Sequence, residues 1–148
     1  MRKINTRRFG ELEIEDQDII RFADGLPAFE EEHEFVVLPY EEDTPYMFLQ
    51  SLTTPELAFL MTDPFVFFPD YSFELDDTNM EKLGVEAMDD ILVCTLISIP
   101  PTGIANMTTN LLAPVVINRH SREARQVVLE KTQYTTKHRL FPKKKEAE

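Results

Sequence analysis

The chain has 148 residues, a formal net charge of −12 at pH 7 and a single cysteine, which fits one domain and excludes an intramolecular disulfide or a cysteine-based metal cluster. The amino-terminal residues lack the apolar run of a signal peptide, and no stretch approaches the roughly 20 apolar residues of a membrane span, so we expect a cytoplasmic protein without membrane contact. Residues 1–99 carry 23 of the 27 acidic residues but 6 of the 15 basic ones, so most of the chain would repel phosphates and direct nucleic-acid binding is not expected.

Short strands separated by turns are predicted in the first third of the chain. Gly25 tolerates a positive φ and Pro27 keeps Leu26 extended, so regular structure should break there. Residues 29–34 are expected to form a short acidic helical or turn segment, and residues 41–45 an exposed acidic loop. The predicted strands are residues 3–7, 11–14, 19–22 and 35–38, the first two forming a hairpin.

The central stretch, residues 46–71, is predicted to hold most of the core. Residues 47–49 and 57–61 are too continuously apolar for half-exposed strands, so two buried strands are expected, with residues 53–56 turning between them. Burial of one Phe or Leu contributes about 1.5–3 kcal/mol. The residues expected in the core or at a contact surface are Phe48, Leu49, Leu52, Leu57, Phe59, Leu60 and Phe65.

One helix follows this stretch. Asp76 or Asp77 can accept the free amides of its first turn, Met80 and Leu83 share one face, and Gly84 is a suitable carboxyl-terminal stop.

The last third of the chain returns to strands, the longest at residues 91–99. Pro114 cannot donate to a strand ladder, which suggests an edge or a bulge within the predicted strand 111–117. A polar turn at 118–123 leads to a strand at 124–129, and residues 142–148 are expected to be a disordered tail. Some nine short strands and one short helix predict a mainly β fold: a small antiparallel β-barrel-like domain over residues 1–141.

The search for catalytic, cofactor-binding or metal-binding residues identifies none. Cys94 lies in an apolar strand and should be an inert, buried thiol. The pairs Asp76-Asp77 and Asp89-Asp90 could be paired carboxylates or a cation site, but a helix cap and a strand-entry turn explain them. The three histidines, His33, His120 and His138, lie far apart on polar or basic segments and are expected at the surface.

Residues 65–75 are not explained by a purely structural role. Successive side chains of an extended segment point to opposite sides, so aromatic residues at both odd and even positions cannot share one buried face. Either the following helix covers them, or they form the apolar centre of an interface with an acidic rim. The candidate partner-binding residues are Leu26, Pro27, Phe68, Pro69, Asp70, Tyr71, Phe73, Glu74, Asp76 and Asp77.

Four sequence fragments in order resemble the bacterial flagellar assembly factor FliW family, and the similarity runs from Ile4 to about Phe141. The fragments are residues 25–30 (GLPAFE), 48–52 (FLQSL), 57–59 (LAF) with Asp63-Pro64, and 110–118 (NLLAPVVIN). Ala28 departs from the pattern, which usually has glycine there, and this argues against a tight turn of positive φ at that position.

The resemblance implies a small β-barrel-like protein without enzymatic activity and with two protein partners. One is flagellin, held in the cytoplasm before export, and the other is the RNA-binding translational repressor CsrA, which FliW antagonises. A chain at −12 would be steered towards the basic RNA-binding surface of CsrA. We expect carboxylates near the RNA path for CsrA and a helix laid in an apolar groove for flagellin, at residues 65–73 or at Leu26-Pro27.

Two other functions stay open from the residues alone. An acidic surface can serve solubility only, and the chain would then be a structural protein without a regulatory partner. The other alternative is a small hydrolase with an acidic cleft that uses Asp63 or Asp70.

Overall fold

The computed structural model describes residues 2–141, and within this range the chain is mainly β. The strands are β1 (Arg2–Thr6), β2 (Gly10–Ile14), β3 (Ile20–Phe22), β4 (Glu34–Pro39), β5 (Tyr46–Ser51), β6 (Ala58–Thr62), β7 (Ile91–Ser98), β8 (Thr108–Thr109), β9 (Val115–Asn118), β10 (Glu123–Gln126) and β11 (His138–Arg139). The α-helices are α1 (Pro64–Phe67) and α2 (Asp77–Leu83), and short 3-10 turns lie at Asp16–Asp18, Met88–Asp90 and Ile104–Asn106.

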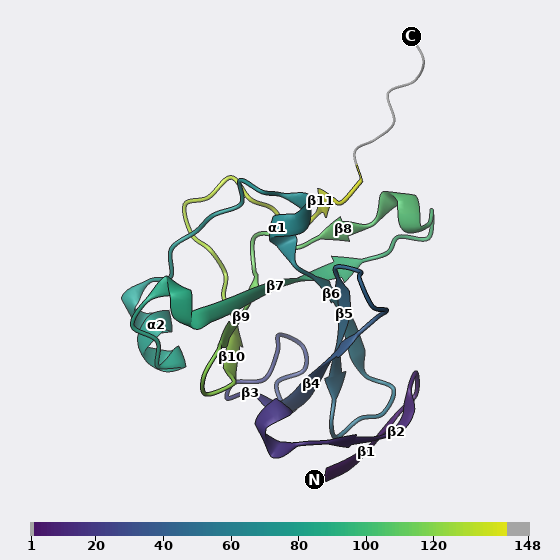
Figure 1. Ribbon diagram of the computed structural model, residues 1–148. Helices are drawn as coiled ribbons and strands as arrows, with labels where there is room; N and C mark the ends of the chain where they lie inside the picture. Colours follow the sequence, from purple (N-terminus) through teal and green to yellow (C-terminus); the bar gives the residue numbers. More distant parts are fainter. Residues whose placement is uncertain (1, 142–148) are drawn as a thin grey trace.

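Seven strands close into a barrel (Figure 1). The order around the ring is β7-β6-β5-β4-β3-β10-β9, and β9 pairs again with β7. All neighbours in the ring are antiparallel except β3 and β10, which are parallel. β8 pairs with the end of β7 and β11 pairs with β8. The predicted barrel-like, mainly β architecture is therefore confirmed.

The barrel encloses an apolar interior because alternate side chains of each strand point inward. In β7, Cys94 and Leu92 belong to this interior, whereas Ile91 and Val93 contact a second cluster outside the barrel. The buried members of the interior are Ile20, Phe22, Leu26, Phe35, Leu49, Met61, Cys94, Val115, Ile117 and Ala124.

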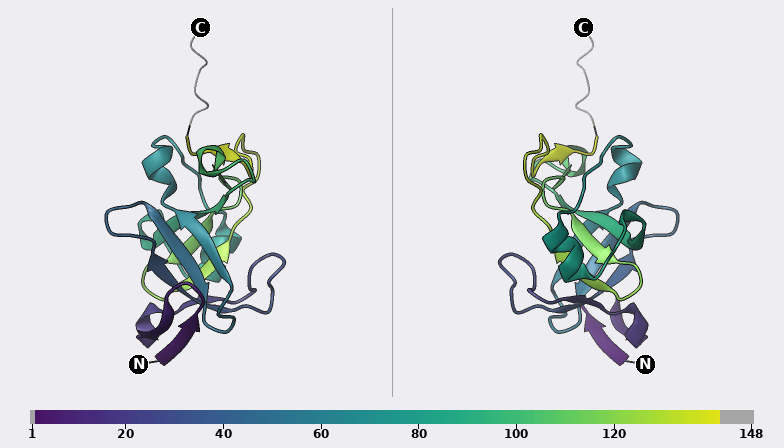
Figure 2. Two further views of the ribbon diagram at one scale, coloured as in Figure 1. Left: turned by 90° about the vertical axis from the view of Figure 1, so that its right-hand side faces the viewer. Right: turned by 90° about the vertical axis from the view of Figure 1, so that its left-hand side faces the viewer.

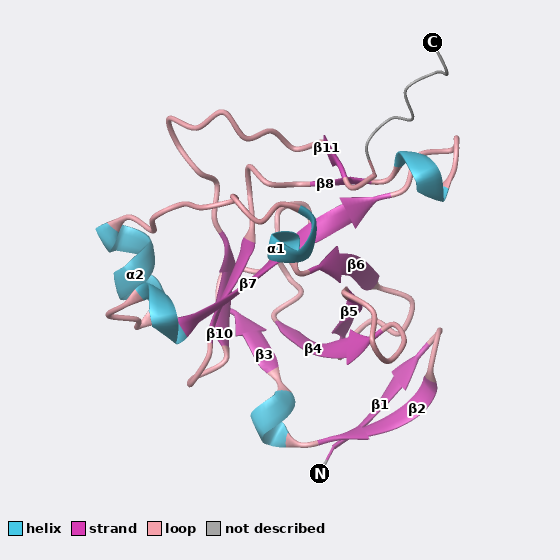
Figure 3. Cartoon of the chain, turned by 45° about the horizontal axis from the view of Figure 1, so that its top comes forward, coloured by secondary structure: helices cyan, strands magenta, loops and turns pink. Residues whose placement is uncertain are grey.

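Two further elements cover the outer faces of the barrel. The β1–β2 hairpin closes a cluster around Ile4, Ile14 and Val36, and it lies at the end opposite α1, β8 and β11 (Figure 2). On another side α2 packs outside the barrel beside β10 (Figure 3) and buries Leu83.

Helix α2 forms where the sequence predicts it. Asp76 is the N-cap, and its Oδ1 accepts a hydrogen bond from the backbone N–H of Asn79 at 2.7 Å. Gly84 ends the helix in the left-handed conformation at φ 69°, and Val85 donates to the carbonyl of Met80 at 3.0 Å. These are the local signals on which the prediction was based.

Helix α1 corrects the expectation that residues 65–75 are extended throughout. The carboxylate of Asp63 accepts from the backbone N–H of Phe65 at 3.0 Å, and Pro64 occupies the first helical position. Proline lacks the N–H that would be unpaired there, and its fixed φ suits a helix start. The turn changes which aromatic side chains face inward, so the alternation argument does not hold for Phe65 to Phe67.

In the last third, two strand boundaries and two additional strands differ from expectation. Residues 111–114 form a loop, and strand β9 begins only after Pro114, whose carbonyl accepts from Val127 N–H at 2.9 Å. Strand β10 ends at Gln126, earlier than predicted, and the short strands β8 and β11 were not predicted. The proposed tail at residues 142–148 lies outside the described residues.

The loop between β3 and β4 contains two residues with positive φ. Gly25 has φ 68°, as its residue type allows, and Ala28 has φ 70°. The expectation that alanine argues against such a turn is wrong, because Leu26 and Phe29 bond to each other through both backbone groups and fix the turn.

Candidate partner-binding surface

The candidate residues lie on two segments that approach each other through Arg125 on β10. One segment is residues 68–77, the α1–α2 connection with the first residue of α2, and the other is the β3–β4 loop, residues 23–33. Arg125 donates to the carboxylate of Asp24 in the loop and to Oδ1 of Asn79 in α2 at 3.3 Å. Arg125 therefore links the β3–β4 loop to helix α2, which begins at the end of the first segment.

Leu26 and Tyr71 are buried, with 2% and 4% of their surface exposed. Leu26 belongs to the barrel interior, and the Tyr71 hydroxyl donates to the carbonyl of Leu111 at 2.8 Å. Their predicted role as direct contact residues stays a prediction, and in the free protein little of either side chain is accessible to a partner.

The other candidates remain accessible. Phe68 and Phe73 are half-buried, and the remaining six are exposed: Pro27, Pro69, Asp70, Glu74, Asp76 and Asp77. Residues 63–77 contain five acidic residues and no basic one. Residues 63–77, which comprise α1, its cap and the connection to the start of α2, therefore form an acidic ridge with aromatic side chains packed beneath it. We call these residues the acidic ridge below.

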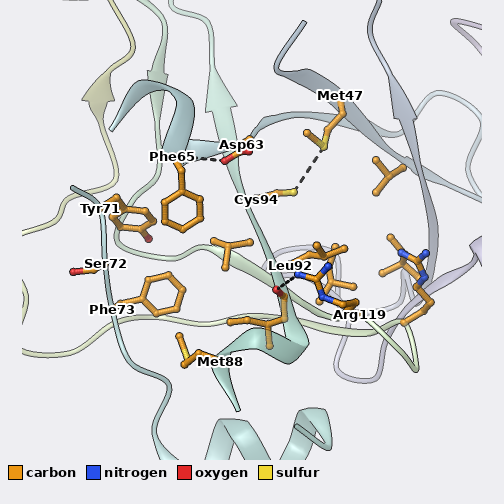
Figure 4. A pocket seen from close by; sticks show the side chains of 16 residues that line it. Met47, Asp63, Phe65, Tyr71, Ser72, Phe73, Met88, Leu92, Cys94 and Arg119 are labelled. Carbon is orange, nitrogen blue, oxygen red and sulfur yellow. Dashed lines mark hydrogen bonds between the residues drawn. The ribbon is translucent and has the colours of Figure 1, made fainter. Parts of the chain in front are cut away.

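A groove of about 650 Å³ runs between the acidic ridge and the barrel, along β7 (Figure 4). Phe65, Tyr71 and Phe73 line one side, and Met47 lies on the other, near Cys94. This groove, called the β7 groove below, was not located from the sequence.

A second, outer groove of about 480 Å³ lies on the other side of the ridge, between residues 72–76 and residues 127–132. Val128 contributes an apolar side chain with 63% of its surface exposed. Glu74, Asp76 and Glu130 line this groove together with Lys131. The acidic ridge thus lies between the β7 groove and the outer groove.

Arg119 and Arg122 are site residues that the sequence did not indicate. Both line the β7 groove, and Arg119 donates to the carbonyls of Asp89 and Ile91 at 3.2 and 3.3 Å. In the sequence they belong to a polar turn. Only the pairing of β9 with β7, which places Asn118 opposite Ile91, brings them to the groove.

The residues considered for catalysis or metal binding lie in different surroundings. Asp63 caps α1, while Asp70 is exposed on the ridge. Burial raises the pKa of the Cys94 thiol to about 12, with a smaller contribution from Asp63. Asp89 and Asp90 lie in the 3-10 turn that enters β7, as expected. Among residues 2–141, no group of three or more His, Cys, Asp or Glu side chains is placed to hold a metal ion.

The histidines also differ in surroundings. His33 Nδ1 lies 2.8 Å from the carbonyl of Phe22 and fastens the β3–β4 loop. His120 is exposed beside Asp90 at 3.2 Å. His138 accepts from Thr135 N–H at 2.9 Å, and partial burial lowers the pKa of its imidazole.

Comparison with known proteins identifies one family over nearly the whole chain. The family model described as FliW protein matches residues 3–140. The flagellar assembly factor FliW of Heliobacterium modesticaldum is 49% identical, over 95% of this chain and 91% of its own. That of Bacillus subtilis is 42% identical, over 91% of this chain and 94% of its own. A crystal structure of the flagellar assembly factor FliW superposes with a TM-score of 0.87 at 44% identity, covering 95% of this chain and 98% of its own. In residues 2–141 no helix has the length and apolar character needed to cross a membrane.

Proposed function

This chain belongs to the FliW family of flagellar assembly factors, and we propose that it acts in the cytoplasm without catalysis, by binding flagellin and the translational repressor CsrA. In this proposal, flagellin occupies the protein until export. The freed protein then binds CsrA and relieves repression of the flagellin message. Flagellin export and flagellin translation are thereby coupled.

The acidic ridge is the observation that carries the CsrA part of this proposal. Its carboxylates Asp70, Glu74 and Asp77 are exposed, and the chain as a whole is at −12. A repressor that binds RNA presents positive charge, so the two surfaces attract and their association is accelerated. Repulsion of RNA phosphates is effective only within about 8 Å at physiological salt, so the ridge would lie beside the RNA path.

Exposed apolar side chains on α1 support the flagellin part. Val66 is 58% exposed and Phe65 is 42% exposed, next to the half-buried Phe68. An amphipathic helix can bury such residues with its apolar face. We propose that a flagellin helix contacts α1, and replacement of Val66 by glutamate should weaken flagellin binding without unfolding the protein.

Charge reversal at the ridge tests the CsrA interface. The triple variant Asp70→Lys, Glu74→Lys, Asp77→Lys keeps the Asp76 cap and should slow association with CsrA at least about tenfold at low salt. It should also leave CsrA able to bind the flagellin message. Surface plasmon resonance and an RNA gel-shift assay measure the two effects.

A matched control carries the same charge change on the far side of the molecule. Glu13→Lys, Glu15→Lys, Asp16→Lys alters exposed residues at or near the β1–β2 hairpin, at the end opposite α1. The control should lose only the general attraction of the net charge. Equal effects of both triple variants would show that the ridge is not the CsrA interface.

A further inference from the structure

Strand β7 is hydrogen-bonded along one edge but only briefly along the other. On the first edge β9 pairs with Ile91 to Cys94, and β8 pairs with Ile97 and Ser98. On the second edge β6 pairs only with Thr95 and Leu96. The chain then turns into α1 at Pro64, which has no N–H to donate. Residues 91–94 therefore keep an edge without a strand partner that faces the β7 groove. On this edge the carbonyl of Ile91 accepts from the guanidinium of Arg119 at 3.3 Å, so an added strand would displace that contact.

The register identifies the backbone groups on this open edge. Arg119 N–H donates to the carbonyl of Asp90 at 2.8 Å, and hydrogen-bonded pairs alternate along an antiparallel ladder. Leu92 and Cys94 thus bond to β9, whereas the N–H and C=O of Val93 point to the other side. Val93 has no partner among the described hydrogen bonds outside the strand ladders.

The groove beside this edge is apolar where side chains of a further strand would point. Met47, Leu92 and Cys94 line it from the barrel, and Phe65 and Phe73 line it from the ridge. An extended chain presents side chains in alternation, so it can fill the groove on one side while its backbone pairs with β7. A helix cannot pair its backbone in this way, because its own peptide groups are bonded within the helix.

Charge distinguishes the two ends of the open edge. Arg119 and Arg122 lie at the end where β7 begins, and neither belongs to an ion pair among residues 2–141. Arg119 donates to the backbone carbonyls of Asp89 and Ile91, so its charge has no carboxylate partner there. Two such arginines in a chain at −12 favour an acidic group at this end. At the other end, near Cys94, stands the carboxylate of Asp63.

We propose that the β7 groove binds an extended peptide segment of a partner protein by strand addition to Ile91–Cys94. The segment runs antiparallel to β7, in the direction that β6 would follow without the turn at Pro64. It presents alternate apolar side chains to the groove and places an acidic side chain, at its carboxyl-terminal end, beside Arg119 and Arg122. Four paired residues span about 14 Å. The inference goes beyond the proposed roles of flagellin and CsrA and does not depend on them.

The unpaired backbone of Val93 can be tested in the free protein. Amide hydrogen exchange measured by NMR should be fast at Val93 and slow at Leu92 and Cys94, whose amides are bonded to β9. Slow exchange at all three amides would overturn the proposal, since the edge would then already be occupied.

The peptide itself is tested with a small library of fluorescein-labelled hexapeptides. Threonine alternates with valine, isoleucine, leucine or phenylalanine, and the last residue is aspartate amide or lysine amide. Aspartate-ended peptides should bind more tightly in fluorescence anisotropy, and binding should slow exchange at Val93. The variant Arg119→Glu, Arg122→Glu should reverse the preference towards lysine. Failure of every peptide to bind at millimolar concentration overturns the proposal.

N-methylation of the peptide distinguishes strand pairing from side-chain contact alone. A methyl group on the amide that faces β7 should weaken binding about threefold to tenfold, the effect of one lost hydrogen bond. A methyl group on the next amide, which faces away, is the matched control and should leave affinity unchanged. Equal effects at both amides, or a bound peptide that is helical by NMR, would refute strand addition.

Discussion

Adding one methyl group at Gly25 tests how the loop after β3 is held. Gly25 has φ 68°, and a Cβ built there would lie 2.5 Å from the carbonyl oxygen of Glu30. Gly10 provides a matched control, since its φ is 72° and a Cβ there would meet nothing within 4 Å. The two glycines have nearly the same positive φ and differ in the space around a Cβ.

The structure fixes the order of the expected effects. A left-handed alanine costs about 1–2 kcal/mol, and the stiffer unfolded chain returns about 0.4–1 kcal/mol. Gly10→Ala should therefore destabilise by about 1 kcal/mol. At Gly25 the obstacle is backbone that cannot rotate away, which adds about 1–3 kcal/mol of strain. Ala28 has φ 70°, so Ala28→Gly should instead stabilise by about 0.5–1 kcal/mol.

Urea unfolding followed by circular dichroism measures all three variants. In thermal unfolding, each kcal/mol of stability corresponds to a shift of about 2–4 °C in Tm for a chain of this size. The expected order of stability is Ala28→Gly above the parent chain, then Gly10→Ala, then Gly25→Ala. If Gly25→Ala is no less stable than Gly10→Ala, the close approach of the Glu30 carbonyl does not constrain this position.

Three further predictions concern buried polar groups. Asn118→Ala should lower the free energy of unfolding by about 2–3 kcal/mol. The Asn118 side chain donates to the carbonyl of Leu83 at 2.7 Å and accepts from the backbone N–H groups of His120 and Ser121. A loss under 0.5 kcal/mol in urea unfolding would contradict this prediction. Tyr71→Phe should lower the free energy of unfolding by about 1 kcal/mol. Because burial raises the pKa of the Tyr71 hydroxyl, the stability of the parent chain should also fall as pH rises above 10, and more steeply than that of the variant. Parallel pH profiles of the two proteins would refute that link. Burial raises the pKa of the Cys94 thiol from 9 to about 12, so at pH 8 it should react with a disulfide reagent far more slowly than free cysteine does. The free energy of unfolding should also fall as pH rises from 9 to 12, because the thiol ionises more readily in the unfolded chain. Reaction at the rate of free cysteine would show that the thiol is accessible.

Local signals in the sequence were sufficient for the elements that depend on neighbouring residues. The cap at Asp76 and the stop at Gly84 define α2 without reference to the rest of the chain. The same chemistry was present at Asp63-Pro64, but α1 has only four residues and shows no helical period. Strands β8 and β11, with two residues each, are likewise too short for any alternation to show.

The site was only partly predictable because its two walls meet through non-local pairing. The acidic residues of the ridge lie within one short stretch of the sequence, residues 63–77, and were found by composition. Burial of Tyr71 was not foreseen, because α1 rotates the aromatic side chains that follow it. Arg119 and Arg122 reach the β7 groove through the β7–β9 register, and no local pattern carries that information.

The parallel pair of β3 and β10 has a consequence for how the chain folds. Phe22 lies opposite Ala124 in this pair, so ring closure joins segments separated by most of the polypeptide. The antiparallel β4–β5–β6 meander has short connections and can form early, whereas long-range pairing slows folding. During synthesis the ring cannot close until β10 has left the ribosome, and until then the edges of β3 and β9, which β10 joins, stay open to chaperones or to aggregation.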